Sequence, residues 1–294
     1  MDFGGQRFGV EQLVTYAETA TALGFDALSV NDHMVFAVPW LDGPTALASV
    51  VSCSGDAQLF TTVVNPVVRG PVALAKTLAA LDVLSGGRVV AGLGPGSSEA
   101  DYASVGIGFD ERWPRFEESV RAVRAAFRGE TFGGRFYKIT GALEPRPVRA
   151  EGPPLWIGSW GSEVGLRRAV RLGDGWLASA YNTTPERFAD SWRTLQHSLE
   201  DSGRDPGGFH NGLATMWFHL DDRHASNVLE DVLAPAMHRP VGELRERLPF
   251  GSAEVVADKL RAFREAGVER VFLWPVTDEL EQLRRFATQV IPLL

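Results

Sequence analysis

Three polar residues, Asn31, Asp32 and His33, directly follow a short apolar segment, residues 26–30, that is typical of a β-strand. Histidine titrates near neutral pH and can accept or donate a proton, and a neighbouring carboxylate can orient its ring. We therefore predict that His33 and Asp32 are catalytic, with Asp32 bonding either to the histidine or to a cofactor ring. The alternative is that Asp32 caps the next turn and His33 fills a polar niche in the core.

Small polar residues and glycines also end the next two predicted strands, residues 58–64 and 89–93. Hydroxyl and amide groups there offer hydrogen bonds to a planar heterocycle. The alternative is that Thr and Val occur here only because both residues favour β-strands. Glycines let the backbone turn and approach a ligand closely, but a tight turn would need them as well. The candidate cofactor-binding residues at these two strand ends are Thr62, Asn65, Gly94, Gly96 and Ser97.

A glycine- and serine-rich segment lies between a predicted strand and a predicted helix. Small residues leave backbone N–H groups exposed at a helix N-terminus, where the helix dipole favours an anion such as phosphate. The candidate phosphate-binding residues are Gly158, Ser159, Trp160, Gly161 and Ser162.

Composition and spacing argue against several classes of function. The net charge is -8, so nucleic acids and anionic membrane surfaces are not expected partners. No apolar run approaches the ~20 residues of a membrane span, no signal peptide is visible, and the one cysteine, Cys53, cannot form an internal disulfide, so we expect a cytoplasmic protein. The His, Asp and Glu residues do not have the spacing of metal ligands, which disfavours a metal site. No lysine lies at the end of a predicted strand, which disfavours a Schiff-base aldolase.

Predicted strands alternate with predicted helices along almost the whole chain. The predicted strands are residues 26–30, 58–64, 89–93, 155–158, 175–178, 213–220 and 270–274. The predicted helices are residues 10–23, 45–52, 72–84, 111–127, 163–171, 185–202, 252–266 and 278–291. This alternation is typical of a parallel sheet with both faces buried, in which ligands bind where the strands end.

The strand pattern predicts an α/β fold, a TIM (β/α)8 barrel with insertions, in one domain that spans residues 1–294. A barrel of this kind has eight strands, and only residues 1–4 remain for a strand before the first helix, so the first strand is expected to be short or missing. Two insertions, residues 129–154 and 234–251, are predicted to shape the substrate pocket, the first as a hairpin or a lid.

Four segments together resemble the bacterial luciferase-like superfamily of flavin- and deazaflavin-dependent oxidoreductases. They are LGFDALSVNDH (residues 23–33), TTVVNPVVRGPVALAKTLAALDVLSGGRVVAGLGPGS (residues 61–97), FDERWPRFEESV (residues 109–120) and PPLWIGSWGSEVGLRRAVRLGDGWL (residues 153–177). The string LDVLSGGRVVAGLGPG is the most specific of them.

The resemblance implies that a cofactor ring lies at the carboxyl ends of the strands, against a bulge formed by a non-proline cis peptide at Thr62-Val63. It places the phosphate-binding turn at residues 158–162 and maps the Asp-His pair of the deazaflavin-dependent members to Asp32 and His33. Those members often have an acidic residue directly after the glycine turn. This sequence has Ser97 there, and Glu99 is a nearby substitute.

Both FMN and the deazaflavin coenzyme F-420 fit this resemblance. The 29 basic residues comprise 26 arginines and three lysines. This bias towards arginine indicates a GC-rich genome and slightly favours F-420. The prediction is an oxidoreductase or monooxygenase that acts on a small organic substrate, and the resemblance implies a homodimer. The alternatives are a non-catalytic cofactor-binding paralogue and a phosphate-binding lyase or isomerase.

Overall fold

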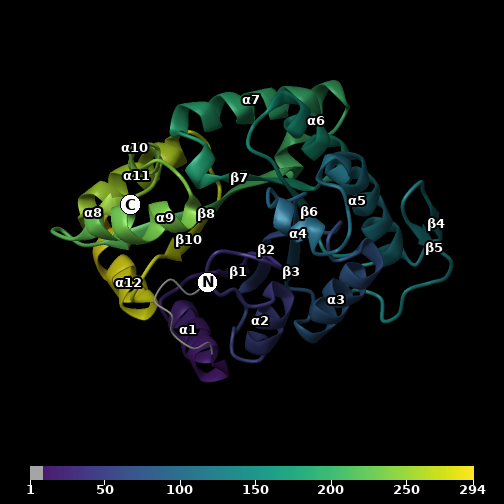
Figure 1. The fold of residues 1–294 in the computed structure, drawn as a ribbon, viewed down its shortest axis with the longest axis horizontal. Helices are drawn as coiled ribbons and strands as arrows, with labels where there is room; N and C mark the ends of the chain where they lie inside the picture. The colour runs from purple at the N-terminus through teal and green to yellow at the C-terminus, as the bar shows by residue number, and fades with distance from the viewer. Residues whose placement is uncertain (1–8) are drawn as a thin grey trace.

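The computed structural model describes residues 9–294 (Figure 1), so the possible first strand at residues 1–4 lies outside the described residues. All seven predicted strands are present and form one parallel sheet. In their order across the sheet they are β1 (Ala27–Val30), β2 (Gln58–Val64), β3 (Val89–Leu93), β6 (Leu155–Gly158), β7 (Gly175–Ser179), β8 (His210–Leu220) and β10 (Val271–Pro275). The sheet is therefore a nearly closed barrel, as predicted, with β1 and β10 as its two edges.

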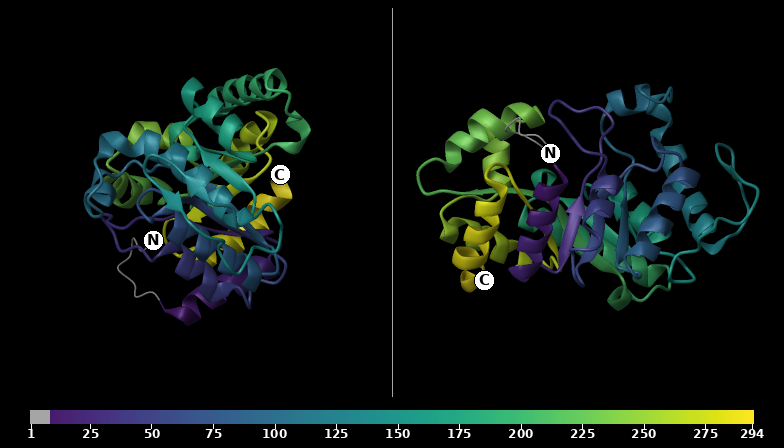
Figure 2. Two further views of the ribbon diagram at one scale, coloured as in Figure 1. Left: turned by 90° about the vertical axis from the view of Figure 1, so that its right-hand side faces the viewer. Right: turned by 90° about the horizontal axis from the view of Figure 1, so that it is seen from below.

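Helices follow most of the strands, and the longer helices cover the outside of the barrel (Figures 1 and 2). The helices of the described residues are α1 (Val10–Ala22), α2 (Gly43–Val50), α3 (Pro71–Leu84), α4 (Glu99–Ala103), α5 (Arg112–Arg128), α6 (Glu163–Leu172), α7 (Pro185–Asp201), α8 (Ala225–Asn227), α9 (Ala234–Met237), α10 (Val241–Arg247), α11 (Ala253–Glu265) and α12 (Glu279–Arg285). Several begin at a side chain that accepts a hydrogen bond from a backbone amide of the first turn, as Ser162, Thr184 and Ser252 do.

A small apolar cluster fills the interior of the barrel. Six of its seven strands contribute one inward side chain each, which is how a barrel of this kind packs its core. These residues are Phe60, Val90, Trp156, Leu177, Ala214 and Phe272. A larger apolar cluster lies between the sheet and the helices. The packed interior leaves the carboxyl ends of the strands as the place for a site.

The first insertion, residues 129–154, contains the predicted hairpin, formed by β4 (Phe132–Gly133) and β5 (Lys138–Ile139). Its predicted contribution to the substrate pocket is wrong, because it follows α5 and precedes β6 and so lies at the amino ends of the strands. Glu118 of α5 accepts hydrogen bonds from the amides of residues 135–137, which attaches the hairpin to the outside of that helix.

The second insertion, residues 234–251, follows β8 and therefore lies on the same side as the carboxyl ends of the strands. It contains α9 and α10 and ends in a short strand, β9 (Phe250–Gly251), which pairs in parallel with the end of β8. Within residues 9–294, none of the helices has the length and apolar character that crossing a membrane requires.

Candidate active site

The ends of neighbouring strands are joined by hydrogen bonds, which brings several predicted site residues to one edge of the barrel. Thr62 Oγ1 at the end of β2 donates to the carbonyl of Val30 in β1 at 3.3 Å. Asn31, which follows β1, accepts a hydrogen bond from the backbone amide of Val63 at 3.3 Å. Since β3 and β6 are next in the sheet, Asp32, Thr62 and Ser159 lie at the same mouth.

The peptide bond between Thr62 and Val63 is cis, at the position that the resemblance implies. The Val63 side chain fits into a hollow that two glycines of the neighbouring strands leave open. A Cβ atom at Gly94 would lie 2.6 Å from Val63 Cγ2, and one at Gly158 would lie 3.1 Å from Val63 Cγ1. The bulge therefore leaves no room for a side chain at position 94 and little room at position 158, which explains both glycines without a direct ligand contact.

His33 lies at the edge of this mouth with 15% of its side chain exposed. Its ring packs against Phe36, with centroids 4.7 Å apart, and against Trp40, with centroids 5.0 Å apart in an edge-on arrangement. The aromatic wall continues to the other edge strand, since the ring of Trp40 lies 6.2 Å from that of Trp274 in β10. The histidine thus has apolar neighbours on its faces and a single polar contact at Nδ1 among the described residues.

That contact is to Asp101 of α4, a residue that the sequence pattern did not single out. His33 Nδ1 lies 2.8 Å from Asp101 Oδ2, while Oδ1 accepts the backbone amides of Met34 at 2.9 Å and Val35 at 2.8 Å. Burial alone would raise the pKa of Asp101, but the hydrogen bonds from His33 and from the two amides outweigh it and lower the pKa. Asp101 is therefore an ionised acceptor at neutral pH.

Asp32, the predicted partner of His33, is held by a different residue. The guanidinium of Arg69 donates two hydrogen bonds to the Asp32 carboxylate, from Nε to Oδ2 at 2.7 Å and from Nη2 to Oδ1 at 2.6 Å. The Asp32 side chain is only 3% exposed. Arg69 also pairs with Asp42. Burial disfavours the charge of Arg69, but the hydrogen bonds and charge of Asp32 outweigh it and raise the pKa of the guanidinium.

Asn65, Gly96 and Ser97 form the connection between the ends of β2 and β3. Asn65 Nδ2 donates to the carbonyl of Pro95 at 2.8 Å, and its Oδ1 accepts the amide of Val67 at 2.9 Å, so this predicted ligand group is bonded within the protein. A Cβ at Gly96, where φ is +70°, would lie 2.9 Å from Asn65 Nδ2. Ser97 is exposed beside them, and Glu99 is exposed on α4.

The predicted phosphate turn follows β6 and leads into α6, which has ten residues. Ser162 caps the helix by accepting the amide of Gly165 at 3.2 Å, and Ser159 Oγ accepts the amide of Gly161 at 3.3 Å. Trp160 is 56% exposed at the rim. The first amides of α6 have no carbonyl within the helix to bind, so the turn presents N–H groups beside two hydroxyls.

Sequence reasoning missed Asp101 and Arg69. A signal for Asp101 was present: Ser98, Glu99, Ala100 and Asp101 fit the pattern of a helix start, in which a serine is followed three residues later by an acid. Ser98 does cap α4, accepting the amide of Asp101 at 3.2 Å. Arg69 gave no such signal. Within residues 9–294, no group of three or more His, Cys, Asp or Glu side chains could hold a metal.

Comparisons with known proteins identify the family and agree with the fold. Residues 2–227 match the model of a family described as luciferase-like monooxygenase. An F420-dependent glucose-6-phosphate dehydrogenase of Nakamurella multipartita is 30% identical over 98% of this chain and 94% of its own. A solved F420-dependent secondary alcohol dehydrogenase has a TM-score of 0.85 at 18% identity, covering 98% of this chain and 96% of the other. Monooxygenase RslO1 from Streptomyces bottropensis has a TM-score of 0.81 at 23% identity, with 96% and 93% covered.

Proposed function

The chain belongs to the luciferase-like monooxygenase family, and on that premise we propose that it is an F-420-dependent oxidoreductase that acts on a small organic substrate at the mouth of the barrel. The observation that carries the proposal is the pairing of His33 with Asp101 beside the bulge at Thr62-Val63. The relatives named as F420-dependent support the choice of cofactor. FMN is the second candidate, since luciferase-like monooxygenase is the family's own description.

The residues at the mouth fit a flat heterocycle with a phosphorylated tail. The bulge at Thr62-Val63 is supported from behind by Gly94 and Gly158, so it can serve as a firm surface for the ring. The N–H groups and hydroxyls of residues 159–162 would hold the phosphate. When bound, a deazaflavin accepts or supplies a hydride, and the protein must then move the accompanying proton.

His33 is the group that we assign to that proton. Because the carboxylate of Asp101 is an acceptor, Nδ1 of His33 must carry its hydrogen, which leaves the lone pair of the neutral ring on Nε2. Nε2 can then accept a proton from a substrate hydroxyl, or return one in the reverse direction. Asp101 orients the ring through Nδ1 and is a positioning residue. Asp32, bound to Arg69, keeps the start of this loop in place.

The proposal is tested by titrating the protein with F-420 and, separately, with FMN while following absorbance and thermal unfolding. A cofactor that binds only the folded state raises the unfolding temperature, so F-420 is expected to give the larger increase. His33→Ala should keep this increase and lose turnover. Binding without turnover of any substrate would favour the non-catalytic paralogue, and no shift with either cofactor would favour the lyase or isomerase.

The finer expectations on organisation belong to the same proposal. We infer one domain for residues 1–294, a homodimer and a cytoplasmic location, from the resemblance and the composition described above. Analytical ultracentrifugation of the full chain checks the dimer, because the sedimentation coefficient separates a monomer of 32.0 kDa from twice that mass.

A further inference from the structure

Among the buried serines and threonines of residues 9–294, Thr215 is the one whose hydroxyl has no hydrogen bond. The residue is only 6% exposed. The other buried hydroxyls all have a partner, and they belong to Ser54, Thr61, Thr62, Ser85, Ser119 and Thr183. A buried polar group without a partner is costly, and a valine would fill the same space and also favour a strand. The hydroxyl of Thr215 therefore calls for a partner that residues 9–294 do not supply.

The backbone of Thr215 is also strained. Its φ is +55°, a value that β-branched residues rarely adopt. The other non-glycine residues with positive φ among residues 9–294 are His238 and Asp278, which lie at helix ends, whereas Thr215 lies inside β8. Strain of this kind persists only where the surrounding structure imposes it, and it is concentrated at functional sites.

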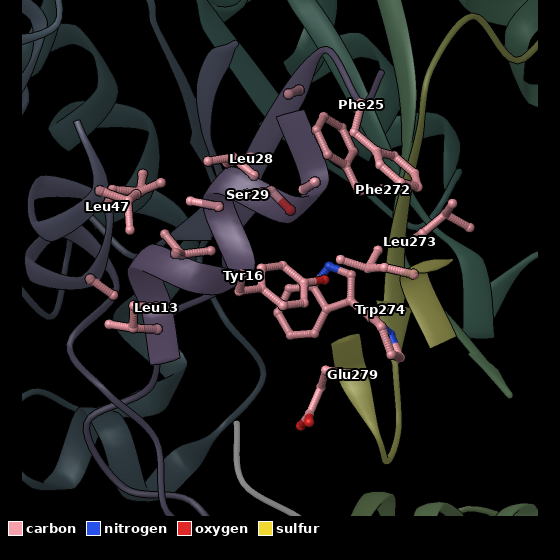
Figure 3. Close-up of a pocket in the computed structure, with 18 of the residues that line it drawn as sticks. Leu13, Tyr16, Phe25, Leu28, Ser29, Leu47, Phe272, Leu273, Trp274 and Glu279 are labelled. Atoms are coloured by element: carbon pink, nitrogen blue, oxygen red, sulfur yellow. The ribbon is translucent and has the colours of Figure 1, made fainter. Parts of the chain in front are cut away.

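A β-bulge in β8 accounts for this backbone and turns Thr215 towards the inside of the barrel. Two steps along β10, past Phe272 (Figure 3), match three steps along β8, from Leu213 to Met216. Leu213 and Met216 both belong to the apolar cluster between the sheet and the helices. The two residues between them, Ala214 and Thr215, therefore share the inner side, and Ala214 is part of the interior cluster.

This bulge lies at the mouth of the barrel, on the wall opposite the bulge at Thr62-Val63. Ala214 pairs with Ser179, the last residue of β7, so Thr215 lies just beyond the end of that strand. In the order of the sheet, β3, β6 and β7 separate β2 from β8, which places the two bulges on opposite walls. A ring that lies against the bulge of β2 turns its free face towards β8. A substrate that reacts at that face lies between the ring and Thr215.

The surroundings of Thr215 are apolar. Residues 211–218 of β8 and residues 271–275 of β10 include no charged side chain, so a charged ligand group would find no partner there. Beyond the bulge, the rings of Trp217 and Trp274 lie 4.8 Å apart. Trp274 in turn lies 6.2 Å from Trp40, which packs against His33. This row of rings extends from β8 to the histidine, so Thr215 and His33 contact different parts of a ligand.

We propose that Thr215 determines specificity, and that its hydroxyl binds an uncharged oxygen of the substrate other than the oxygen whose proton His33 moves. The inference rests on the proposed function, which places the substrate between the cofactor ring and β8. A hydroxyl group can both donate and accept, so it can bind an alcohol, ether or carbonyl oxygen. The substrate class is therefore a molecule with an apolar frame and a second, uncharged oxygen.

The test uses the full chain loaded with F-420 and three probes, cyclohexanol and the 1,3- and 1,4-diols of cyclohexane. Calorimetric titration should show that wild-type protein binds at least one diol about tenfold more tightly than cyclohexanol, because the second hydroxyl gains a hydrogen bond. Thr215→Val keeps the shape of the side chain and should bind all three probes alike. Thr215→Ser keeps the hydroxyl and should keep the preference. The affinity for F-420 should be unchanged in both variants.

The ligand-free protein provides a matched control. Thr61→Val removes a hydroxyl that donates to the carbonyl of Gly92 at 2.8 Å, so it should lower the unfolding temperature and leave the diol preference intact. Thr215→Val removes a hydroxyl without such a partner, so the unfolding temperature should stay the same or rise. An equal decrease in both variants overturns the proposal, since the Thr215 hydroxyl is then bonded within the protein.

Three results of the titrations overturn the proposal as well. The first is a wild-type protein that prefers neither diol, and the second is a preference that survives in Thr215→Val. The third is a loss of F-420 affinity in Thr215→Val, since the partner of the hydroxyl is then the cofactor. Each of these results leaves the binding of F-420 to wild-type protein intact, so failure of this inference is distinct from failure of the proposed function.

Discussion

The carboxyl ends of β1 and β2 are held together in the opposite way to the two edge strands β1 and β10. We call the boundary between β1 and β10 the seam. The ends of β1 and β2 are joined through buried polar groups, among them Asp32, which Arg69 holds with two hydrogen bonds. The seam is bridged at one end by the ion pair of Arg270 with Asp26, whose side chain is 77% exposed, and at the other by the aromatic contact of Trp40 with Trp274. The barrel is therefore rigid where the proposed chemistry lies and weakly joined beside it.

This difference indicates which contacts the site depends on. A buried carboxylate that loses its partner leaves an uncompensated charge, whereas an exposed ion pair exchanges its partner for water at little cost. Substitutions at the strand ends should accordingly lower stability and activity much more than substitutions at the seam.

The largest effect is expected from Arg69→Met. The methionine keeps much of the apolar stem but leaves the Asp32 carboxylate buried without a partner, which should lower the free energy of unfolding by about 3 kcal/mol or more. Urea unfolding followed by fluorescence measures it. Arg187→Met, at an exposed arginine, is the control and should change little. Equal effects of the two substitutions would show that the Asp32–Arg69 pair contributes no more to the free energy of unfolding than an exposed arginine does.

Arg69 also shows where sequence reasoning ends. The strands, their order and the turn residues that end them follow from hydrophobic patterns and glycine positions, which are local. The pairing of Asp32 with Arg69 and of His33 with Asp101 depends on how two loops pack together across 37 and 68 positions of the chain. Because Asp32 and His33 are adjacent in the sequence, we predicted that they form a pair. In the structure, Asp32 instead binds Arg69 and His33 binds Asp101.

The second prediction concerns Asp101→Asn. The amide oxygen of asparagine can still accept from Met34 and Val35, but its NH₂ group faces His33 Nδ1 and favours the tautomer with the hydrogen on Nε2. Turnover should fall by about 100-fold or more, with a smaller change in cofactor affinity. Steady-state kinetics and cofactor titration separate the two. Glu99→Gln tests the acid proposed from sequence, and a loss as large as that of Asp101→Asn would favour Glu99.

The same substitution has a signature in the pH dependence of stability. The pKa of Asp101 is lowered in the folded state, so its contribution to stability is complete above the unfolded value of about 3.9 and is lost as pH falls through the folded value. Between about pH 5 and pH 2, wild-type protein should therefore lose more stability than the Asp101→Asn variant. If thermal unfolding shows that the two proteins lose the same amount of stability over this pH range, the ionised Asp101 does not stabilise the fold in this way.

The third prediction is that Gly94→Ala costs about 1–3 kcal/mol of stability and also weakens cofactor binding. The added Cβ would lie 2.6 Å from Val63 Cγ2, so the bulge at Thr62-Val63 must move toward the mouth. Gly141→Ala, where the added atom meets nothing within 4 Å, is the matched control. If cofactor affinity stays unchanged while stability falls, the bulge does not support the ring.

The resemblance located this bulge, whereas the residues alone gave only threonines and valines that any strand could contain. The hydrophobic pattern predicts seven strands for a barrel that needs eight, and all seven are present among the described residues. The position of residues 129–154 could have been derived from topology, since a segment between a helix and the next strand lies at the amino ends of a parallel sheet. That rule is stronger than the general expectation that an insertion shapes a substrate pocket.

The smallest effect is expected at the seam itself, from Arg270→Gln. The Arg270–Asp26 pair has good geometry, with two hydrogen bonds, but Asp26 is 77% exposed, so its loss should cost less than about 1 kcal/mol. Chemical unfolding in low and high salt measures this cost, which should shrink further as salt screens the pair in the wild type. Because Arg270 directly precedes β10 and so lies at the amino ends of the strands, away from the mouth that holds His33, turnover should stay close to wild type. A loss of several kcal/mol, or a turnover change as large as that of Asp101→Asn, would mean that this bridge and the active site act as one unit.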